Sequence, residues 1–164
     1  AISRLERNEF PRGINGVIFL LHKPVGLGKA ENVLSPHDPR VAEFFRQVDR
    51  GNRQFKVGLD SCCVPGVVNF CHNVIPEAID TCEGGRFSCY ISPEMIMTPC
   101  SFDQDLNYGV SLLEHTIERA WNSQIFEQFR ESLRKRCPDC IRRESCMGGC
   151  PILQEIVLCK EINV

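Results

Sequence analysis

The chain has 164 residues, of which 43% are hydrophobic and 24% are charged, and its formal net charge is −2. These values are ordinary for a globular protein with one core or slightly more, and the lack of a basic excess argues against nucleic acid as a partner. The longest apolar run, GVIFLL at 16–21, is too short to cross a bilayer, and no signal-peptide pattern is present. We therefore expect a cytoplasmic protein without a membrane partner.

The first half of the chain alternates strand and helix patterns. An apolar run at 16–22 predicts a strand, and residues 35–51 predict a helix with Asp38 as its N-cap and Pro39 at its first position. Residues 54–66 predict a second strand. Strand, helix and strand in this order form a βαβ unit, which predicts a parallel sheet.

The second half predicts a hairpin followed by two helices. Residues 87–91 and 96–99 read as strands joined by the turn SPEM. An S-x-x-E capping box at 111–114 predicts a short helix through Trp121, and Ser123 can cap a second helix. We interpret the apolar stripe of that second helix as plain core: Ile125, Phe126, Phe129 and Leu133.

Eleven cysteines are the strongest chemical signal in the chain. Their odd number and the missing signal peptide argue against a disulfide framework, although disulfides and inert thiols stay open as alternatives. In a reducing compartment closely spaced cysteines more often hold metal, because thiolates are soft ligands and a C-x2-C step lets two of them reach one centre. Eight cysteines would suffice for two four-ligand sites, which could hold iron–sulfur clusters or zinc: Cys82, Cys89, Cys100, Cys137, Cys140, Cys146, Cys150 and Cys159.

The spacing of these cysteines resembles the SPASM motif of radical S-adenosylmethionine (SAM) enzymes. Twelve residues separate Cys82 from Met95, and four more separate Met95 from Cys100. After a gap, the motif continues with the C-x2-C-x5-C-x3-C run at 137–150 and ends at Cys159. Segments such as TCEGGRFSCYISPEMIMTPCSF also resemble the C-terminal module of members that modify ribosomally made peptides.

The resemblance implies an α/β fold in two parts. Residues 1–78 would form the last βα units of a partial (β/α)6 barrel, and residues 79–164 a small α+β SPASM domain with a β-hairpin and helices. In the family the C-terminal ends of the strands face cofactor and substrate, so Lys23, Asp60 and Ser61 are candidates for the cofactor-binding cavity. The alternative without a binding role is that Lys23 is a solvated loop lysine and that Asp60 and Ser61 form hydrogen bonds within their loop.

The resemblance also implies two auxiliary 4Fe-4S clusters with interleaved ligands. The first set of cysteines would be Cys82, Cys89, Cys100 and Cys150, and the second set Cys137, Cys140, Cys146 and Cys159. The spacing of Cys89 varies in the family, and some members leave one iron open for substrate. The three cysteines outside the motif are interpreted as buried apolar thiols: Cys62, Cys63 and Cys71.

Two residues depart from the family pattern. Met95 stands where the motif has glycine, and glycine there tolerates a backbone that a long side chain resists. Ser101 stands where anaerobic sulfatase-maturating members carry an aspartate base, and Asp103 lies two positions further along. This argues against sulfatase maturation and favours modification of a precursor peptide. The resemblance also implies an electron donor such as ferredoxin or flavodoxin as a partner.

Radical chemistry in the family starts at a C-x3-C-x2-C loop, and these 164 residues contain no such triplet. We expect that loop, and with it SAM and a third 4Fe-4S cluster, in sequence upstream of Ala1. The chain alone is then expected to bind clusters but to generate no radical, and no catalytic residue can be assigned within it.

Two other functions fit the same cysteines. A zinc-ribbon-like binding module without enzymatic activity would also use sites of four cysteines. A ferredoxin-like electron carrier would use two clusters without substrate chemistry. Iron, sulfide and zinc contents distinguish the first alternative from the cluster proteins.

Overall fold

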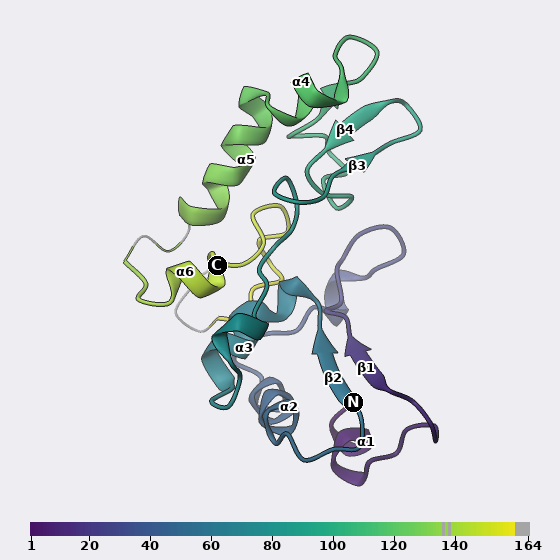
Figure 1. Ribbon diagram of the computed structural model, residues 1–164, viewed down its shortest axis with the longest axis vertical. Coiled ribbons are helices and arrows are strands. Elements are labelled where there is room, and N and C mark those ends of the chain that lie inside the picture. The colour runs from purple at the N-terminus through teal and green to yellow at the C-terminus, as the bar shows by residue number, and fades with distance from the viewer. Residues whose placement is uncertain (136, 138, 160–164) are drawn as a thin grey trace.

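The computed structural model describes residues 1–135, 137 and 139–159. The fold is mixed α/β, with two small sheets and several short helices. Figure 1 shows a lower half with β1, β2 and α1–α3, and an upper half with β3, β4, α4 and α5. Within the described part of the chain, no helix combines the length and apolarity that a membrane span needs.

The lower half confirms the predicted βαβ unit. Strands β1 (Gly16–Phe19) and β2 (Lys56–Leu59) pair in parallel, and helix α2 (Pro39–Asp49) lies between them in sequence. The Asp38 side chain accepts the backbone N–H of Arg40 at 2.8 Å, so this residue is the predicted N-cap. The described residues contain one such unit, and the partial barrel and the boundary between residues 78 and 79 stay predictions.

Both parallel strands end earlier than predicted. The N–H of Leu21 donates to Asp60 Oδ2 at 3.2 Å instead of to a neighbouring strand. Leu21 is 7% exposed and turns into the core, whereas Leu20 is 74% exposed. A side chain that follows β2 therefore ends the sheet and holds the two strand ends together.

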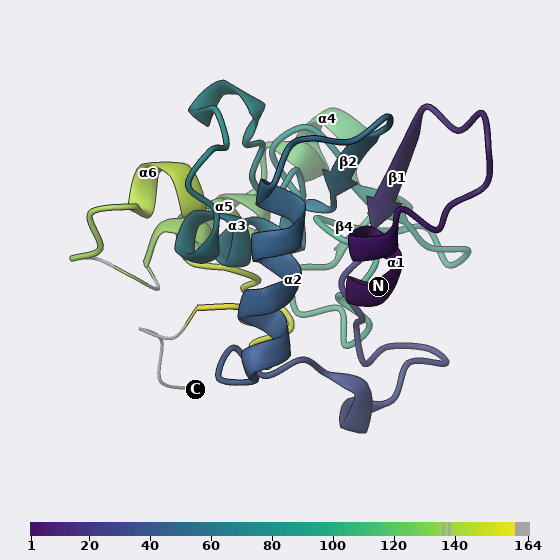
Figure 2. The same cartoon turned by 90° about the horizontal axis from the view of Figure 1, so that it is seen from below.

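Helix α2 is the centre of the lower half. Figure 2 shows it between α1 (Ile2–Arg7) and α3 (Val64–Phe70). Phe45 of α2 is 1% exposed, and a Cβ atom on Gly66 of α3 would lie only 2.2 Å from its ring. Glycine at this position is what lets the two helices approach.

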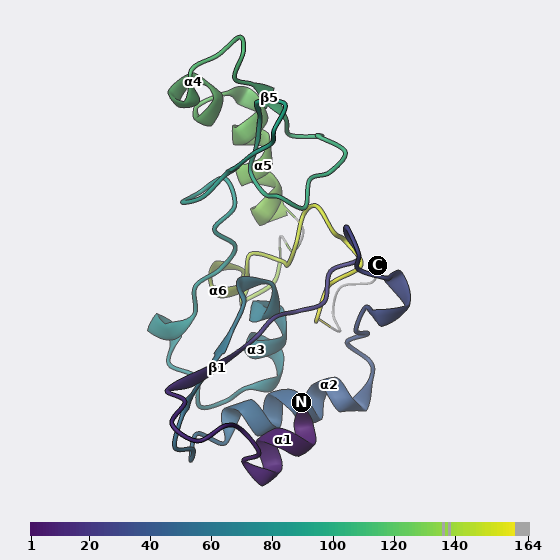
Figure 3. The same ribbon diagram turned by 90° about the vertical axis from the view of Figure 1, so that its right-hand side faces the viewer.

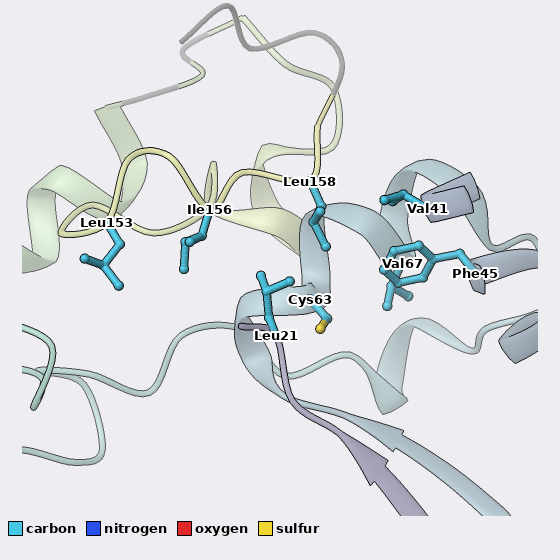
Figure 4. Packing of buried hydrophobic residues seen from close by; sticks show 8 residues of the cluster. All are labelled: Leu21, Val41, Phe45, Cys63, Val67, Leu153, Ile156 and Leu158. Carbon is cyan, nitrogen blue, oxygen red and sulfur yellow. The ribbon is translucent and has the colours of Figure 1, made fainter. Parts of the chain in front are cut away.

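The C-terminal segment returns to the lower half and completes its core. Figure 3 shows this segment, coloured yellow, between α5 above and α2 and α3 below. Its buried apolar side chains join those of the strand ends and helices in one cluster, shown in Figure 4: Leu21, Val41, Phe45, Cys63, Val67, Leu153, Ile156 and Leu158. Contacts between residues far apart in sequence thus decide where the last cysteines lie.

The upper half confirms the predicted hairpin and adds a strand. Strands β3 (Tyr90–Ile91), β4 (Ile96–Thr98) and β5 (Val110–Ser111) form an antiparallel sheet in that order. The predicted capping box is wrong, because Ser111 pairs with β4 as part of β5. Helix α4 (Ile117–Trp121) starts later, where the Thr116 hydroxyl accepts a backbone N–H.

Helix α5 (Gln124–Lys135) follows its prediction closely. The Ser123 hydroxyl accepts the N–H of Phe126 at 3.4 Å, which confirms the cap. Phe126, Phe129 and Leu133 are buried as predicted, but Ile125 is 36% exposed because it lies beside the stripe. The remaining helices are short: α6 (Arg143–Cys146) and the 3-10 turns Ala30–Asn32, Ser61–Cys63 and Pro76–Ala78.

Met95 occupies the hairpin turn in a left-handed conformation, with φ of 61°. Its N–H donates to the carbonyl of Ser92 at 3.0 Å, and its own carbonyl accepts the N–H of Leu112 at 2.8 Å. The turn keeps the backbone that glycine would adopt readily, although the residue is methionine. A left-handed non-glycine residue costs about 1–2 kcal/mol.

We expect Met95→Gly to stabilise the protein by about 0.5–1 kcal/mol, because relief of this strain exceeds the added entropy of the unfolded chain. The side chain is 43% exposed, so little packing is lost. Denaturant titration under anaerobic conditions measures the free energy of unfolding. Glu94→Gly, at an exposed neighbour with negative φ, is the control and should lower stability. Equal losses in both variants would contradict the strain argument.

Candidate metal centre

A cavity of about 360 Å³ lies where the two halves of the chain meet. The ends of the parallel strands, the start of the upper half and the C-terminal segment all contribute to its wall. We call it the first cavity. Its lining contains every cysteine of the first set: Cys82, Cys89, Cys100 and Cys150.

Two glycines bring Cys82 next to Cys100. A Cβ atom on Gly84 would lie 2.9 Å from the carbonyl oxygen of Pro99, so the two loops touch through their backbones. Gly85 has φ of 63°, and its N–H donates to the same carbonyl at 3.1 Å. These contacts hold the two cysteine loops side by side, and larger residues would separate them.

Cys150 reaches the first cavity from the other end of the chain. Gly148 and Gly149 precede it with φ of 78° and 85°, a conformation that glycine adopts without strain. After Cys150, the segment continues into the lower core through Leu153. The N–H of Leu153 donates to Cys150 Sγ at 3.3 Å. A glycine turn and the packing of the tail therefore place this thiol.

Cys89 is the exposed member of the first set. It lies directly before β3 of the hairpin, whereas Cys82, Cys100 and Cys150 are half-buried. The structure therefore gathers three half-buried thiols of the first set in the wall of the first cavity and places the fourth in a solvent-accessible part of that wall. Cys62 and Cys146 line the same cavity.

Burial raises the pKa of Cys82 to about 11, and the charges of Cys150 and Cys100 act in the same direction. The N–H of Gly84 opposes this by donating to the sulfur. Burial also raises the pKa of Cys100, against an N–H bond from Phe102. Crowded, buried thiolates repel one another, so a cationic centre is needed to hold them all ionised.

The second set surrounds a smaller cavity of about 20 Å³, which we call the second cavity. Its lining contains Cys137, Cys140, Cys146 and Cys159. Burial raises the pKa of Cys146, the charges of the other three raise it further, and the N–H of Gly148 opposes the shift. A volume of this size holds about one water molecule. A multi-iron core therefore requires the surrounding loop to move outward.

Both sets offer four thiols, which is the donor chemistry of iron–sulfur clusters. Among residues 1–135, 137 and 139–159, no three His, Cys, Asp or Glu side chains lie close enough together to hold one metal ion. The cysteines of a 4Fe-4S cluster bind different irons, so their sulfurs stand further apart than around a single zinc. The described cysteines also form no disulfide.

Lys23, Asp60 and Ser61 all line the first cavity. Lys23 Nζ forms an ion pair with Asp60 Oδ2, and it donates to the carbonyl of Leu21 at 3.0 Å. The two charged side chains are only 12% and 17% exposed, so the interpretation of Lys23 as a solvated loop lysine is wrong. Asp60 accepts the N–H of Leu21, which confirms its predicted role as a loop hydrogen-bonding residue.

Two further residues near the site were not predicted to belong to it. Cys62 follows Ser61 and lines the first cavity. Arg86 donates from Nη1 to the hydroxyl of Thr81 at 2.7 Å and to the carbonyl of Cys82 at 3.1 Å, which places its positive charge beside that thiol. The position of Cys62 directly after Asp60 and Ser61, which were predicted to face the cavity, was the one signal in the sequence that could have identified it.

Residues 82–146 match the family model of SPASM, described as an iron–sulfur cluster-binding domain. The matched segment supports a SPASM domain in the upper half of the chain, and with it the binding of iron–sulfur clusters. It contains six of the eight predicted ligands, while Cys150 and Cys159 follow it.

A search of curated proteins finds the putative lipase ATG15 of Candida glabrata, which is 33% identical over 81 residues. The alignment covers 44% of this chain and 16% of that protein. The G-x-S-x-G pattern of α/β-hydrolase nucleophiles does not occur in the 164 residues. No solved structure matches the chain.

We expect Lys23→Met to destabilise the protein by about 3 kcal/mol, because it leaves the largely buried Asp60 carboxylate without its cation. The double variant Lys23→Met, Asp60→Asn should recover most of that loss. Urea denaturation of the parent, both single variants and the double variant measures the coupling free energy. Strictly additive effects would show that the pair contributes nothing jointly.

The same pair predicts a dependence on alkaline pH. Burial lowers the Lys23 pKa, but the hydrogen bond to Asp60 and the nearby negative charges outweigh it, so the pKa is raised above 10.5. A raised pKa gives stability that is complete below the ordinary lysine pKa and is lost as pH rises through the folded value. The parent should therefore lose this contribution above about pH 10.5, whereas Lys23→Met should not.

Proposed function

We propose that the chain holds two auxiliary 4Fe-4S clusters in a radical SAM enzyme that modifies a ribosomally made peptide. One observation carries the proposal: each set of four motif cysteines lines one cavity, in the interleaved order that the resemblance implies, and Cys146 of the second set also reaches the wall of the first cavity. The first set would hold one cluster and the second set the other. Residues 1–78 would belong to the partial barrel of that enzyme.

The two cavities suit different tasks. The first cavity is the larger, and it is lined by the Lys23–Asp60 pair and by the exposed Ser101. It is therefore the place where a peptide would meet the chain. The second cavity lies among Val68, Asn69 and the segment at 139–148, and its cluster would stabilise that segment. Bound clusters would supply electron transfer, or an open iron for substrate, with a ferredoxin or flavodoxin as donor.

The surroundings of Ser101 support peptide modification over sulfatase maturation. Ser101 lines the first cavity where sulfatase-maturating enzymes carry their aspartate base. We expect that the nearby Asp103 does not replace that base, because the residue is 3% exposed and its carboxylate accepts the N–H groups of Asn107 and Tyr108 at 3.1 and 2.8 Å. These hydrogen bonds stabilise the loop at 103–108, and Asp103 does not line the first cavity.

Anaerobic purification followed by metal analysis tests the proposal. We expect about eight irons and about eight sulfides per chain, with little zinc, because each set of four cysteines takes one 4Fe-4S cluster. Zinc in place of iron, without acid-labile sulfide, would support the zinc-ribbon alternative and contradict the proposal.

Cys140→Ala sharpens this test. The variant should lose about four irons, because it removes a ligand of the second cluster only. It should also melt at a lower temperature. Ser101→Ala is the matched control, since it changes the wall of the first cavity without removing a thiol, and it should keep the full iron content. An unchanged iron content in Cys140→Ala would refute the ligand assignment.

A further inference from the structure

We propose that Cys62 is a ligand of the first cluster, together with Cys82, Cys100 and Cys150, and that Cys89 stays outside the coordination sphere. This inference rests on the proposed binding of a cluster in the first cavity. It reassigns a residue that lies outside the cysteine motif, and it changes what the cluster does for the fold.

The placement of Cys62 is the first reason. It lies in the 3-10 turn Ser61–Cys63, directly after β2 and Asp60, and it lines the first cavity together with Cys82, Cys100 and Cys150. Cys146 lines this cavity too, but it also lines the second cavity with the rest of its own set. Cys62 is half-buried, as those three thiols are, whereas Cys89 is exposed. A site with its fourth thiol on the inner wall keeps water from the irons better than one that depends on an exposed thiol.

The neighbouring Cys63 has a different environment from Cys62, although both lie in the same turn. Cys63 is 4% exposed and belongs to the lower core with Leu21 and Val67, as Figure 4 shows. It does not line the first cavity, although its neighbours Ser61 and Cys62 do. The turn therefore buries Cys63 within the core, whereas Cys62 packs against the edge of the same cluster and also lines the cavity.

The electrostatic environment of Cys62 agrees with this placement. Cys150 and Cys82, which both belong to the first set, interact electrostatically with Cys62, as do the Lys23 ammonium group and the Asp60 carboxylate. Lys23 also acts on Cys100, so one ammonium group faces the same group of sulfurs.

Binding is a simple exchange at sulfur. The S–H bond of Cys62 breaks, an Fe–S bond forms, and the proton goes to solvent, with no change in the oxidation state of iron or sulfur. The cluster would then bridge β2 of the lower half and the two loops of the upper half. It would tie the two halves together as well as order the upper one.

The test compares three serine variants of the full chain, each reconstituted with iron and sulfide under anaerobic conditions. Cys62→Ser should lose about four irons or change the electron paramagnetic resonance (EPR) spectrum of one reduced cluster. Cys89→Ser should keep the iron content and the spectrum of the parent. Cys71→Ser is the matched control, because Cys71 is also half-buried but does not line either cysteine cavity.

A second measurement separates a lost ligand from a damaged fold. The cluster-free Cys62→Ser chain should melt at the temperature of the cluster-free parent, and addition of a small thiol should restore the lost spectrum by filling the open position. No rescue by thiol, or a parental spectrum and iron content in Cys62→Ser, would overturn the inference. A parent that binds no iron would overturn the proposed function itself, so the two failures are distinguishable.

Discussion

The return of the C-terminal segment into the lower core is the constraint on which the site depends. Leu153, Ile156 and Leu158 are at most 9% exposed and pack against Leu21 and Phe45. Each buried aliphatic side chain of this kind contributes roughly 1.5–3 kcal/mol. This packing places Cys150 at the first cavity and Cys159 at the second, although neither cavity is formed mainly by the tail.

Two opposing effects act on the pKa values of the thiols that line the cavities. Burial and mutual repulsion raise the pKa values of Cys82, Cys100 and Cys146, whereas backbone N–H groups two residues later donate to each sulfur and favour the thiolate. The backbone thus prepares the sulfurs to accept a cation without supplying one. Metal binding in such a site contributes directly to the folding free energy.

The lower half contributes to this centre through the ends of its strands. The carboxyl ends of parallel strands point toward one edge, where ligands of α/β folds commonly bind. Asp60 joins these ends by accepting the N–H of Leu21 and pairing with Lys23. If Cys62 is a ligand, the cluster couples this edge to the loops of the upper half, and the site becomes a joint between both parts of the chain.

Local patterns in the sequence determined much of the fold, because neighbours along the chain decide caps, turns and periodicity. The Asp38 and Ser123 caps, the parallel βαβ unit and the hairpin were all predicted in this way. Type and spacing of the cysteines likewise pointed to a cluster-binding domain. Ser111 was predicted to cap a helix because the pairing that holds it in β5 comes from Ile96, which no local pattern reveals.

Only the tertiary structure decided which side chains share a cavity. Cys62 and Cys63 are neighbours in sequence, yet Cys62 lines the cavity at the edge of the core and Cys63 is buried within the core. Lys23 and Asp60 are separated by 37 positions and meet because the parallel strands end side by side. Such juxtapositions depend on packing between distant segments, so the sequence determined the chemistry available to this protein, and the fold decided where it is assembled.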